Sequence, residues 1–113
     1  TVFANLPISS RTATEEIFGP VVTVHTFASD EEAITMANAT DYGLAGSVWT
    51  ADIQRGHTFA RNVESGIVWV NTWLNRDLRT PFGGVKQSGV GREGGRWSMD
   101  FFSELTNICI RQP

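Results

Sequence analysis

The apolar positions between residues 21 and 43 follow two different periods. Val21 to Phe27 are rich in β-branched and aromatic side chains, which predicts a strand. Ser29 begins a capping-box pattern, and apolar residues then recur at helical spacing as far as Gly43. Glycine adopts the left-handed conformation that ends many helices, so a helix is predicted from Ser29 to Gly43. Residues 1–20 show no such period and predict a loop.

The same alternation repeats in the next part of the chain. Leu44 to Thr50 predict a second strand, and Asp52 is the N-cap of a helix that Gly66 ends. Ile67 to Val70 form a continuous apolar run, as strands covered on both faces do. Strands that alternate with helices predict an α/β fold, in which crossover helices join parallel strands.

The remaining third of the chain has a different character. Six of the eleven glycines lie between Gly83 and Gly95, which predicts an ordered loop without regular structure. Trp97 to Leu105 predict a short helix, and Thr106 to Arg111 alternate as a strand does. A terminal strand has an unpaired edge and needs a partner. We therefore divide the chain into a main body, residues 1–105, and a strand-forming tail, residues 106–113.

Composition narrows the class of protein. With 113 residues and 41% hydrophobic content, the chain is long and apolar enough to fill a core and should be globular. A net charge of −3 argues against a nucleic-acid or acidic-membrane partner. Cys109 is the single cysteine, so a reducing, cytoplasmic location is expected. The chain begins at Thr1 and not at Met, which favours a piece of something longer.

Three patterns that could carry catalysis or metal binding do not fit their surroundings. Gly89 to Gly94 satisfy G-x-G-x-x-G but lack the preceding strand and the acidic residue about 20 positions on that a dinucleotide fingerprint requires. Cys109 lies in the predicted terminal strand, with no neighbouring base. His25, His57 and Cys109 do not make up the four ligands of a zinc site. No catalytic residue and no metal site are predicted.

Two charge clusters allow both a structural and a binding interpretation. Five of the nine Lys and Arg residues lie between Arg76 and Arg96. They could tie loop carbonyls together, or they could clamp a carboxylate or phosphate. Glu15 and Glu16 could be solvated surface groups, or carboxylates held on a stiff backbone that accept hydrogen bonds from a sugar diol.

Two long motifs, in order, resemble the aldehyde dehydrogenase family. They are Glu-Glu-Ile-Phe-Gly-Pro-Val at residues 15–21 and Pro-Phe-Gly-Gly-Val-Lys-Gln-Ser-Gly-Val-Gly-Arg-Glu at residues 81–93. The intervening segments 41–45 and 65–71 are also similar to that family. The resemblance covers essentially all 113 residues. It implies the C-terminal part of the catalytic domain of such an enzyme.

The resemblance implies roles for individual residues. Glu16 would accept the hydroxyls of the nicotinamide-side ribose of NAD, and Phe18 would pack against the nicotinamide end; NADP stays an open alternative. Phe82 would line the aldehyde tunnel, and residues 71–80 would form a substrate-facing loop. The tail would join the sheet of another subunit in a homo-oligomer.

The family mechanism also implies what this chain lacks. A cysteine nucleophile, a glutamate base and an oxyanion-holding asparagine lie upstream of the first motif in such enzymes. Only 14 residues precede that motif here, so the chain alone is expected to be inactive.

Within the family, residues 71–81 are most similar to 2-aminomuconic and 2-hydroxymuconic semialdehyde dehydrogenases, enzymes of aromatic compound catabolism. Their substrates carry a carboxylate, and a guanidinium in the loop would clamp it. Arg76 is the first candidate for this clamp and Arg79 the second. The alternative is a non-catalytic anion-binding or interaction module.

Overall fold

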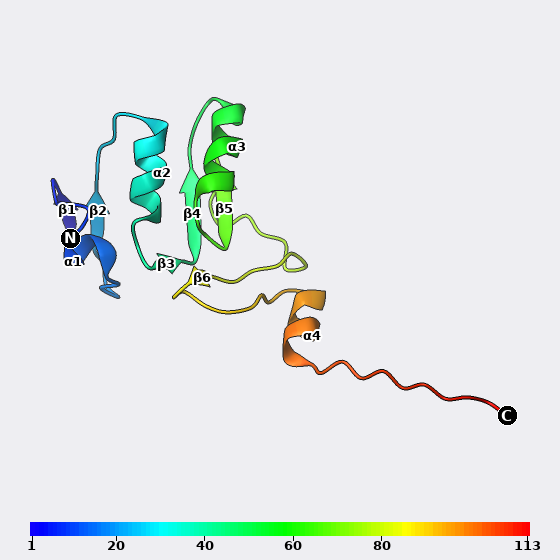
Figure 1. Cartoon of the computed structure of the whole chain (residues 1–113). Helices are drawn as coiled ribbons and strands as arrows, with labels where there is room; N and C mark the ends of the chain where they lie inside the picture. The colour runs from blue at the N-terminus through cyan, green and yellow to red at the C-terminus, as the bar shows by residue number, and fades with distance from the viewer.

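The computed structural model describes all residues, 1–113, and follows the order of elements seen in Figure 1. Strands alternate with helices through the first two thirds of the chain, and a glycine-rich segment, a short helix and an extended tail follow. The elements are β1 (Val2–Ala4), α1 (Arg11–Thr14), β2 (Val22–Val24), α2 (Asp30–Asn38), β3 (Tyr42–Gly43), β4 (Ala45–Val48), α3 (Ile53–Asn62), β5 (Ile67–Val70), β6 (Val85–Lys86) and α4 (Arg96–Phe102).

The predicted strand–helix–strand unit around Asp52 is confirmed. β4 and β5 are parallel, with Ala45 opposite Ile67 and Val48 opposite Val70, and α3 connects them. The Asp52 carboxylate accepts hydrogen bonds from the backbone N–H groups of the first turn of α3. The α/β prediction therefore holds for this part of the chain.

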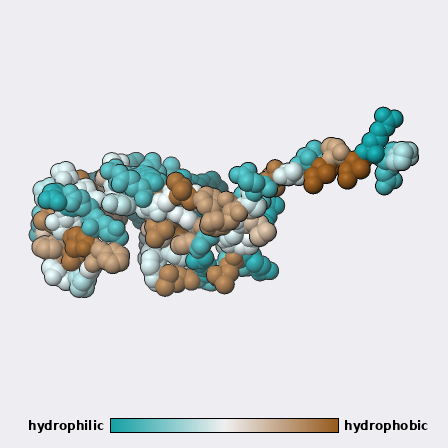
Figure 2. All heavy atoms as spheres, turned by 90° about the horizontal axis from the view of Figure 1, so that it is seen from below, coloured by the Kyte–Doolittle hydropathy of each residue, from teal (hydrophilic) through white to brown (hydrophobic).

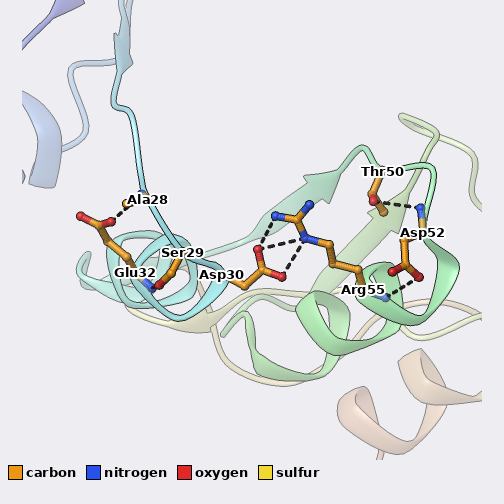
Figure 3. Close-up of polar contacts among 7 residues, drawn as sticks. All are labelled: Ala28, Ser29, Asp30, Glu32, Thr50, Asp52 and Arg55. Atoms are coloured by element: carbon orange, nitrogen blue, oxygen red, sulfur yellow. Dashed lines mark hydrogen bonds and ion pairs between the residues drawn. The ribbon is translucent and has the colours of Figure 1, made fainter.

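Side-chain contacts at the starts of α2 and α3 are drawn in Figure 3. The Ser29 hydroxyl accepts from the Glu32 backbone N–H at 3.2 Å, and Glu32 accepts from the Ala28 N–H at 2.7 Å. Arg55 on α3 forms an ion pair with Asp30, the first residue of α2. Each helix is thus capped by its own sequence, and the two are joined by a contact between residues far apart in the chain.

The strand predicted at residues 21–27 forms over Val22–Val24, but it does not pair with β4 or β5. β2 pairs in parallel with β1, a strand inside the segment predicted to be a loop, with Val2 opposite Val22. A hollow of about 750 Å³ separates β2 from β4. The alternation of apolar residues identifies a strand but not its neighbour, because pairing depends on contacts between distant segments.

Gly43 and Gly66 do not end helices as predicted. α2 ends at Asn38 and α3 at Asn62. Neither glycine has a positive φ; instead, the Gly66 N–H donates to the Gly43 carbonyl at 3.1 Å. A Cβ on Gly66 would overlap the carbonyl of Gly83. Both glycines therefore permit close backbone packing and are not helix caps.

The glycine-rich segment is more regular than predicted. Val85 pairs with Gly43 in the antiparallel β3–β6 ladder, and Phe82 forms an antiparallel bridge with Glu93. The short helix α4 begins one residue before the predicted Trp97 start and ends at Phe102, not at Leu105. These pairings fold the segment back on the end of the β4–β5 sheet.

The predicted strand at residues 106–111 does not form within this chain. Residues 103–113 extend away from the other elements, as Figure 1 shows. Leu105, Ile108 and Ile110 are 92%, 76% and 83% exposed. A terminal strand needs a second edge to satisfy its backbone N–H and C=O groups, and residues 106–111 pair with no strand of this chain.

The chain buries few of its apolar side chains. Trp69 is the single buried large hydrophobic residue, and the other three buried residues are glycines. The radius of gyration is 18.9 Å, compared with about 13 Å for a compact chain of about 100 residues. Figure 2 shows apolar side chains open to solvent on the body and along the tail. No helix has the length and apolar character needed to cross a membrane.

Candidate functional site

The loop between β5 and Phe82, residues 71–81, is fixed at its start by Asn71. This residue has a φ of 55°, in the left-handed region that asparagine tolerates. Its side-chain oxygen accepts from the Thr50 N–H at 2.8 Å, and its side-chain nitrogen donates to the Thr50 carbonyl at 2.8 Å. The amide thus pairs with Thr50 as a further strand residue would. The sequence marked Asn71 as the beginning of the loop but did not predict this contact.

The middle of the loop is held by Trp69. The indole N–H of Trp69 donates to the Asn75 carbonyl at 2.7 Å. The Trp69 ring also meets the Trp73 ring edge to face, with 4.9 Å between centroids. Trp69 is 6% exposed, so this anchor is buried in the sheet below the loop. Sequence reasoning assigned Trp69 to a strand and missed its contact with the loop.

Arg76 and Phe82, two of the predicted substrate-binding residues, lie together. The Arg76 guanidinium lies over the Phe82 ring, 4.0 Å from its centroid. Its Nη2 is 3.4 Å from Glu93 Oε1, and the Arg76 side chain is 26% exposed. Phe82 is fixed in turn, because its backbone exchanges two 2.8 Å hydrogen bonds with Glu93. A guanidinium has five N–H donors, so most of those of Arg76 remain available.

Arg79, the second candidate clamp, is already paired. Its Nε and Nη2 atoms contact the two carboxylate oxygens of Asp77 at 2.9 and 2.5 Å. Hydrogen bonds from Arg79 hold the pKa of the Asp77 carboxyl below its usual value, and the same pair raises the pKa of Arg79. The fork geometry that would bind a substrate carboxylate is therefore occupied by a residue of the same loop.

Other basic residues of this stretch support the structural interpretation. Lys86 Nζ donates to the carbonyls of Asn38 and Thr40 at 2.9 and 3.0 Å and lies 2.6 Å from Glu64 Oε2. Arg92 donates to two carbonyls of the glycine-rich segment at 2.9 and 2.7 Å. These side chains tie loops together, so they are not free to bind an anion.

Gly94 packs closely against the backbone of the 71–81 loop. It has a φ of 104°, and a Cβ at this position would overlap the carbonyl oxygen of Thr80. Its N–H is bound by the Ser98 hydroxyl at 2.9 Å. The glycine-rich segment thus approaches the 71–81 loop at backbone distance, which a residue with a side chain would prevent.

The predicted cofactor-binding residues lie elsewhere, between α1 and β2. Glu16 and Phe18 line an open hollow of about 590 Å³. Glu15 also lines it, but its carboxylate is bound by Arg11 at 2.7 and 2.9 Å, which lowers its pKa. Glu16 makes no side-chain hydrogen bond or ion pair, and Phe18 is 94% exposed with a φ of 51°. The pair Glu15–Glu16 is thereby divided into a paired and a free carboxylate.

The residues considered for other chemistry lie apart from these groups. Cys109 is exposed in the tail, where its sulfur lies 3.6 Å from the side-chain oxygen of Asn107. The Nε2 atom of His25 is buried beside β2 without a hydrogen-bond partner. Neither residue has the neighbouring base that an activated nucleophile needs.

Comparison with known proteins agrees with the order of motifs. Residues 1–108 match the profile of the aldehyde dehydrogenase family. The 2-hydroxymuconic semialdehyde dehydrogenase of Pseudomonas putida is 53% identical over 111 residues, which cover 98% of this chain and 23% of the relative. The 2-aminomuconic semialdehyde dehydrogenase of Mus musculus is 52% identical with the same coverage. The chain spans about a quarter of the length of these relatives.

Solved structures give the same result. HpcC from Thermus thermophilus superposes with a TM-score of 0.91 and 46% identity, over 99% of this chain and 22% of that one. An indole-3-acetaldehyde dehydrogenase in complex with NAD+ superposes with a TM-score of 0.87 and 48% identity, over 93% of this chain and 21% of that one.

Proposed function

Because this chain belongs to the aldehyde dehydrogenase family, we propose that it forms the cofactor-positioning and substrate-selecting part of an NAD-dependent enzyme that oxidises an aldehyde to the acid. The substrate we propose is a muconic-type semialdehyde, which bears a carboxylate at the end remote from the aldehyde. Two relatives that are identical to this chain at about half of the 111 aligned positions are named for such substrates.

The observation that carries this proposal is the stack of Arg76 on Phe82, 4.0 Å from the ring centroid. An unsaturated semialdehyde offers a flat apolar chain and a terminal carboxylate. Phe82 supplies an apolar face for the chain, and Arg76 supplies a bidentate partner for the carboxylate. Fixing both ends of the substrate would orient the aldehyde toward the nucleophile.

Glu16 and Phe18 are our candidates for holding NAD. A free carboxylate beside an exposed ring on an open hollow suits a ribose diol with a flat heterocycle next to it. Solved relatives in complex with NAD+ support this cofactor, and NADP remains the alternative. NAD, when bound, accepts the hydride that leaves the aldehyde carbon.

The covalent chemistry is proposed to lie in the part of the enzyme upstream of residue 15. No candidate nucleophile of this chain lies near the 71–81 loop, since Cys109 is in the tail. The 113-residue chain alone should therefore show no aldehyde-dependent formation of NADH. We also propose that the tail, residues 106–113, adds a strand to the sheet of another subunit.

The clamp is tested in the full-length enzyme by Arg76→Ala. Loss of a charge-assisted hydrogen bond costs about 1.5–3 kcal/mol, so the KM for 2-hydroxymuconic semialdehyde should rise about 10- to 100-fold. The KM for hexanal, which has no carboxylate, should change about twofold at most. Steady-state rates of NADH formation measure both.

Arg79→Ala is the matched control, because Asp77 already occupies its guanidinium. It should alter the ratio of the two KM values far less than Arg76→Ala does. If Arg76→Ala raises the KM values for both aldehydes by the same factor, the clamp is contradicted. If Arg79→Ala changes the ratio of the two KM values more than Arg76→Ala does, the clamp is assigned to Arg79.

A further inference from the structure

Two side chains hold the 71–81 loop at separate points, one by binding the loop backbone and the other by tying the first loop residue to Thr50, and the proposed function gives neither a role. They are Trp69 in β5 and Asn71 at the end of that strand. We propose that Trp69 and Asn71 are positioning residues that hold Arg76 over Phe82 and so set the preference of the enzyme for carboxylate-bearing aldehydes. This inference rests on the proposed clamp function of Arg76.

Asn71 fixes the point at which the loop leaves the sheet. Its backbone N–H donates to the Val48 carbonyl at 2.8 Å, which is the last ladder bond between β5 and β4. Its side chain then makes two bonds to Thr50, one donated and one accepted. The left-handed backbone at Asn71 turns the chain out of the sheet at the same residue. The direction in which the loop starts is therefore determined by one side chain.

Trp69 fixes the peptide unit that precedes Arg76. The Asn75 carbonyl carbon is bonded to the Arg76 nitrogen, so the 2.7 Å bond from the indole N–H restrains the backbone from which Arg76 projects. Trp69 is the most buried side chain of the chain and packs against Trp73, so the donor itself has little freedom. The rigid indole of Trp69 thus fixes the backbone position from which the Arg76 side chain extends.

The far end of the Arg76 side chain is restrained by Glu93 and Phe82, which are themselves paired through their backbones. Arg76 is held at its base by Trp69 and at its tip by this pair. Without the anchors, the loop would have to be ordered at the moment the carboxylate binds, which weakens binding. Because the reacting end of the substrate is untouched, the loss should appear in KM and only for substrates with a carboxylate.

The experiment uses the full-length enzyme with Trp69→Phe and, separately, Asn71→Gly. Phenylalanine keeps an aromatic ring in the sheet and removes the N–H. Glycine keeps the left-handed backbone and removes both bonds to Thr50. Trp69→Phe loses one hydrogen bond and Asn71→Gly loses two, so each variant should raise the KM for 2-hydroxymuconic semialdehyde at least about fivefold. The KM for hexanal and both kcat values should stay within about twofold.

Trp97→Phe is the matched control, because it makes the same chemical change in α4, where the ring lies beneath Arg96 and donates no hydrogen bond to the loop. It should leave the ratio of the two KM values as in the wild type. If Trp69→Phe does not fold, Asn71→Gly decides by itself, since Asn71 is exposed and its new residue suits the backbone.

The outcomes separate this inference from the function on which it rests. If Arg76→Ala shifts the KM ratio but the variants of Trp69 and Asn71 do not, the anchoring role is wrong and the clamp stands. If Trp69→Phe and Asn71→Gly raise the KM values for both aldehydes by the same factor, the two residues have a general structural role and the inference is also overturned. If Arg76→Ala itself leaves the ratio unchanged, the clamp and the anchoring are both wrong.

Discussion

Pairs of like residues in this chain are distinguished by their partners. Glu15 is bound by Arg11, whereas Glu16 is free on the hollow beside Phe18. Arg79 is bound by Asp77, whereas Arg76 lies on Phe82 with donors to spare. In both pairs the family resemblance favoured the residue that the structure leaves available. The structure adds the reason that the other member is not equivalent.

At this scale we expect Glu16→Ala to weaken cofactor binding in the full-length enzyme. Removing a carboxylate that accepts from a ribose diol costs about 1.5–3 kcal/mol, so the Kd for NAD+ should rise about 10- to 100-fold. Quenching of tryptophan fluorescence on titration with NAD+ measures this. Glu15→Ala, which removes a carboxylate already paired with Arg11, should change the Kd much less. Equal changes in the two variants would show that Glu16 has no special contact with the cofactor.

Helices α2 and α3 are stabilised both by local N-caps and by an ion pair between them. Their N-caps, Ser29 and Asp52, are local and were predicted from the sequence. The ion pair between Asp30 and Arg55 links the two helices across 25 positions of sequence (Figure 3). Hydrogen bonds from Arg55 lower the pKa of Asp30. The pair is partly exposed, so its contribution is reduced by solvent and salt.

The lowered pKa of Asp30 gives a pH dependence with a definite sign. A carboxyl whose pKa is lower in the folded state contributes stability above its unfolded pKa, about 3.9, and loses it as the pH falls through the folded value. Asp30→Asn should therefore have a lower Tm than the wild-type enzyme at pH 7, and this difference should shrink below about pH 4. Thermal unfolding at low salt measures it. A Tm difference that stays constant between pH 7 and pH 3 would contradict the assignment.

The whole molecule has too few buried side chains for an independent domain. Trp69 alone is buried among the large hydrophobic residues, and the hollow between β2 and β4 leaves the facing edges of these strands unpaired. The tail adds exposed apolar residues that alternate with polar ones. Surfaces of this kind are normally covered by other polypeptide.

At the scale of the assembly, we expect the double substitution Ile108→Asp and Ile110→Asp to dissociate the full-length enzyme into smaller species. These residues share one face of the alternating tail, and burying two carboxylates in a subunit sheet is unfavourable. Cys109→Ser, on the opposite face, should leave the oligomer intact. Light scattering coupled to gel filtration measures the mass, and an unchanged mass in the double variant would show that the tail is not an assembly strand.

The local features of the fold could be predicted from the sequence by itself. The caps at Ser29 and Asp52 and the run from Ile67 to Val70 involve residues close together in the chain, so their pattern is sufficient. The order of the two long motifs placed the chain in its family for the same reason: each motif is a continuous segment.

Only the tertiary structure decided which elements and side chains meet. The pairing of β2 with β1, the β3–β6 ladder and the close contact at Gly43 and Gly66 join distant segments. The position of Arg76 depends in the same way on Glu93, 17 residues away. A periodic pattern indicates that a residue needs a partner, but the packing of the whole chain determines which residue that partner is. For this reason only the tertiary structure distinguishes Arg76, which lies over Phe82, from Arg79, which is paired with Asp77.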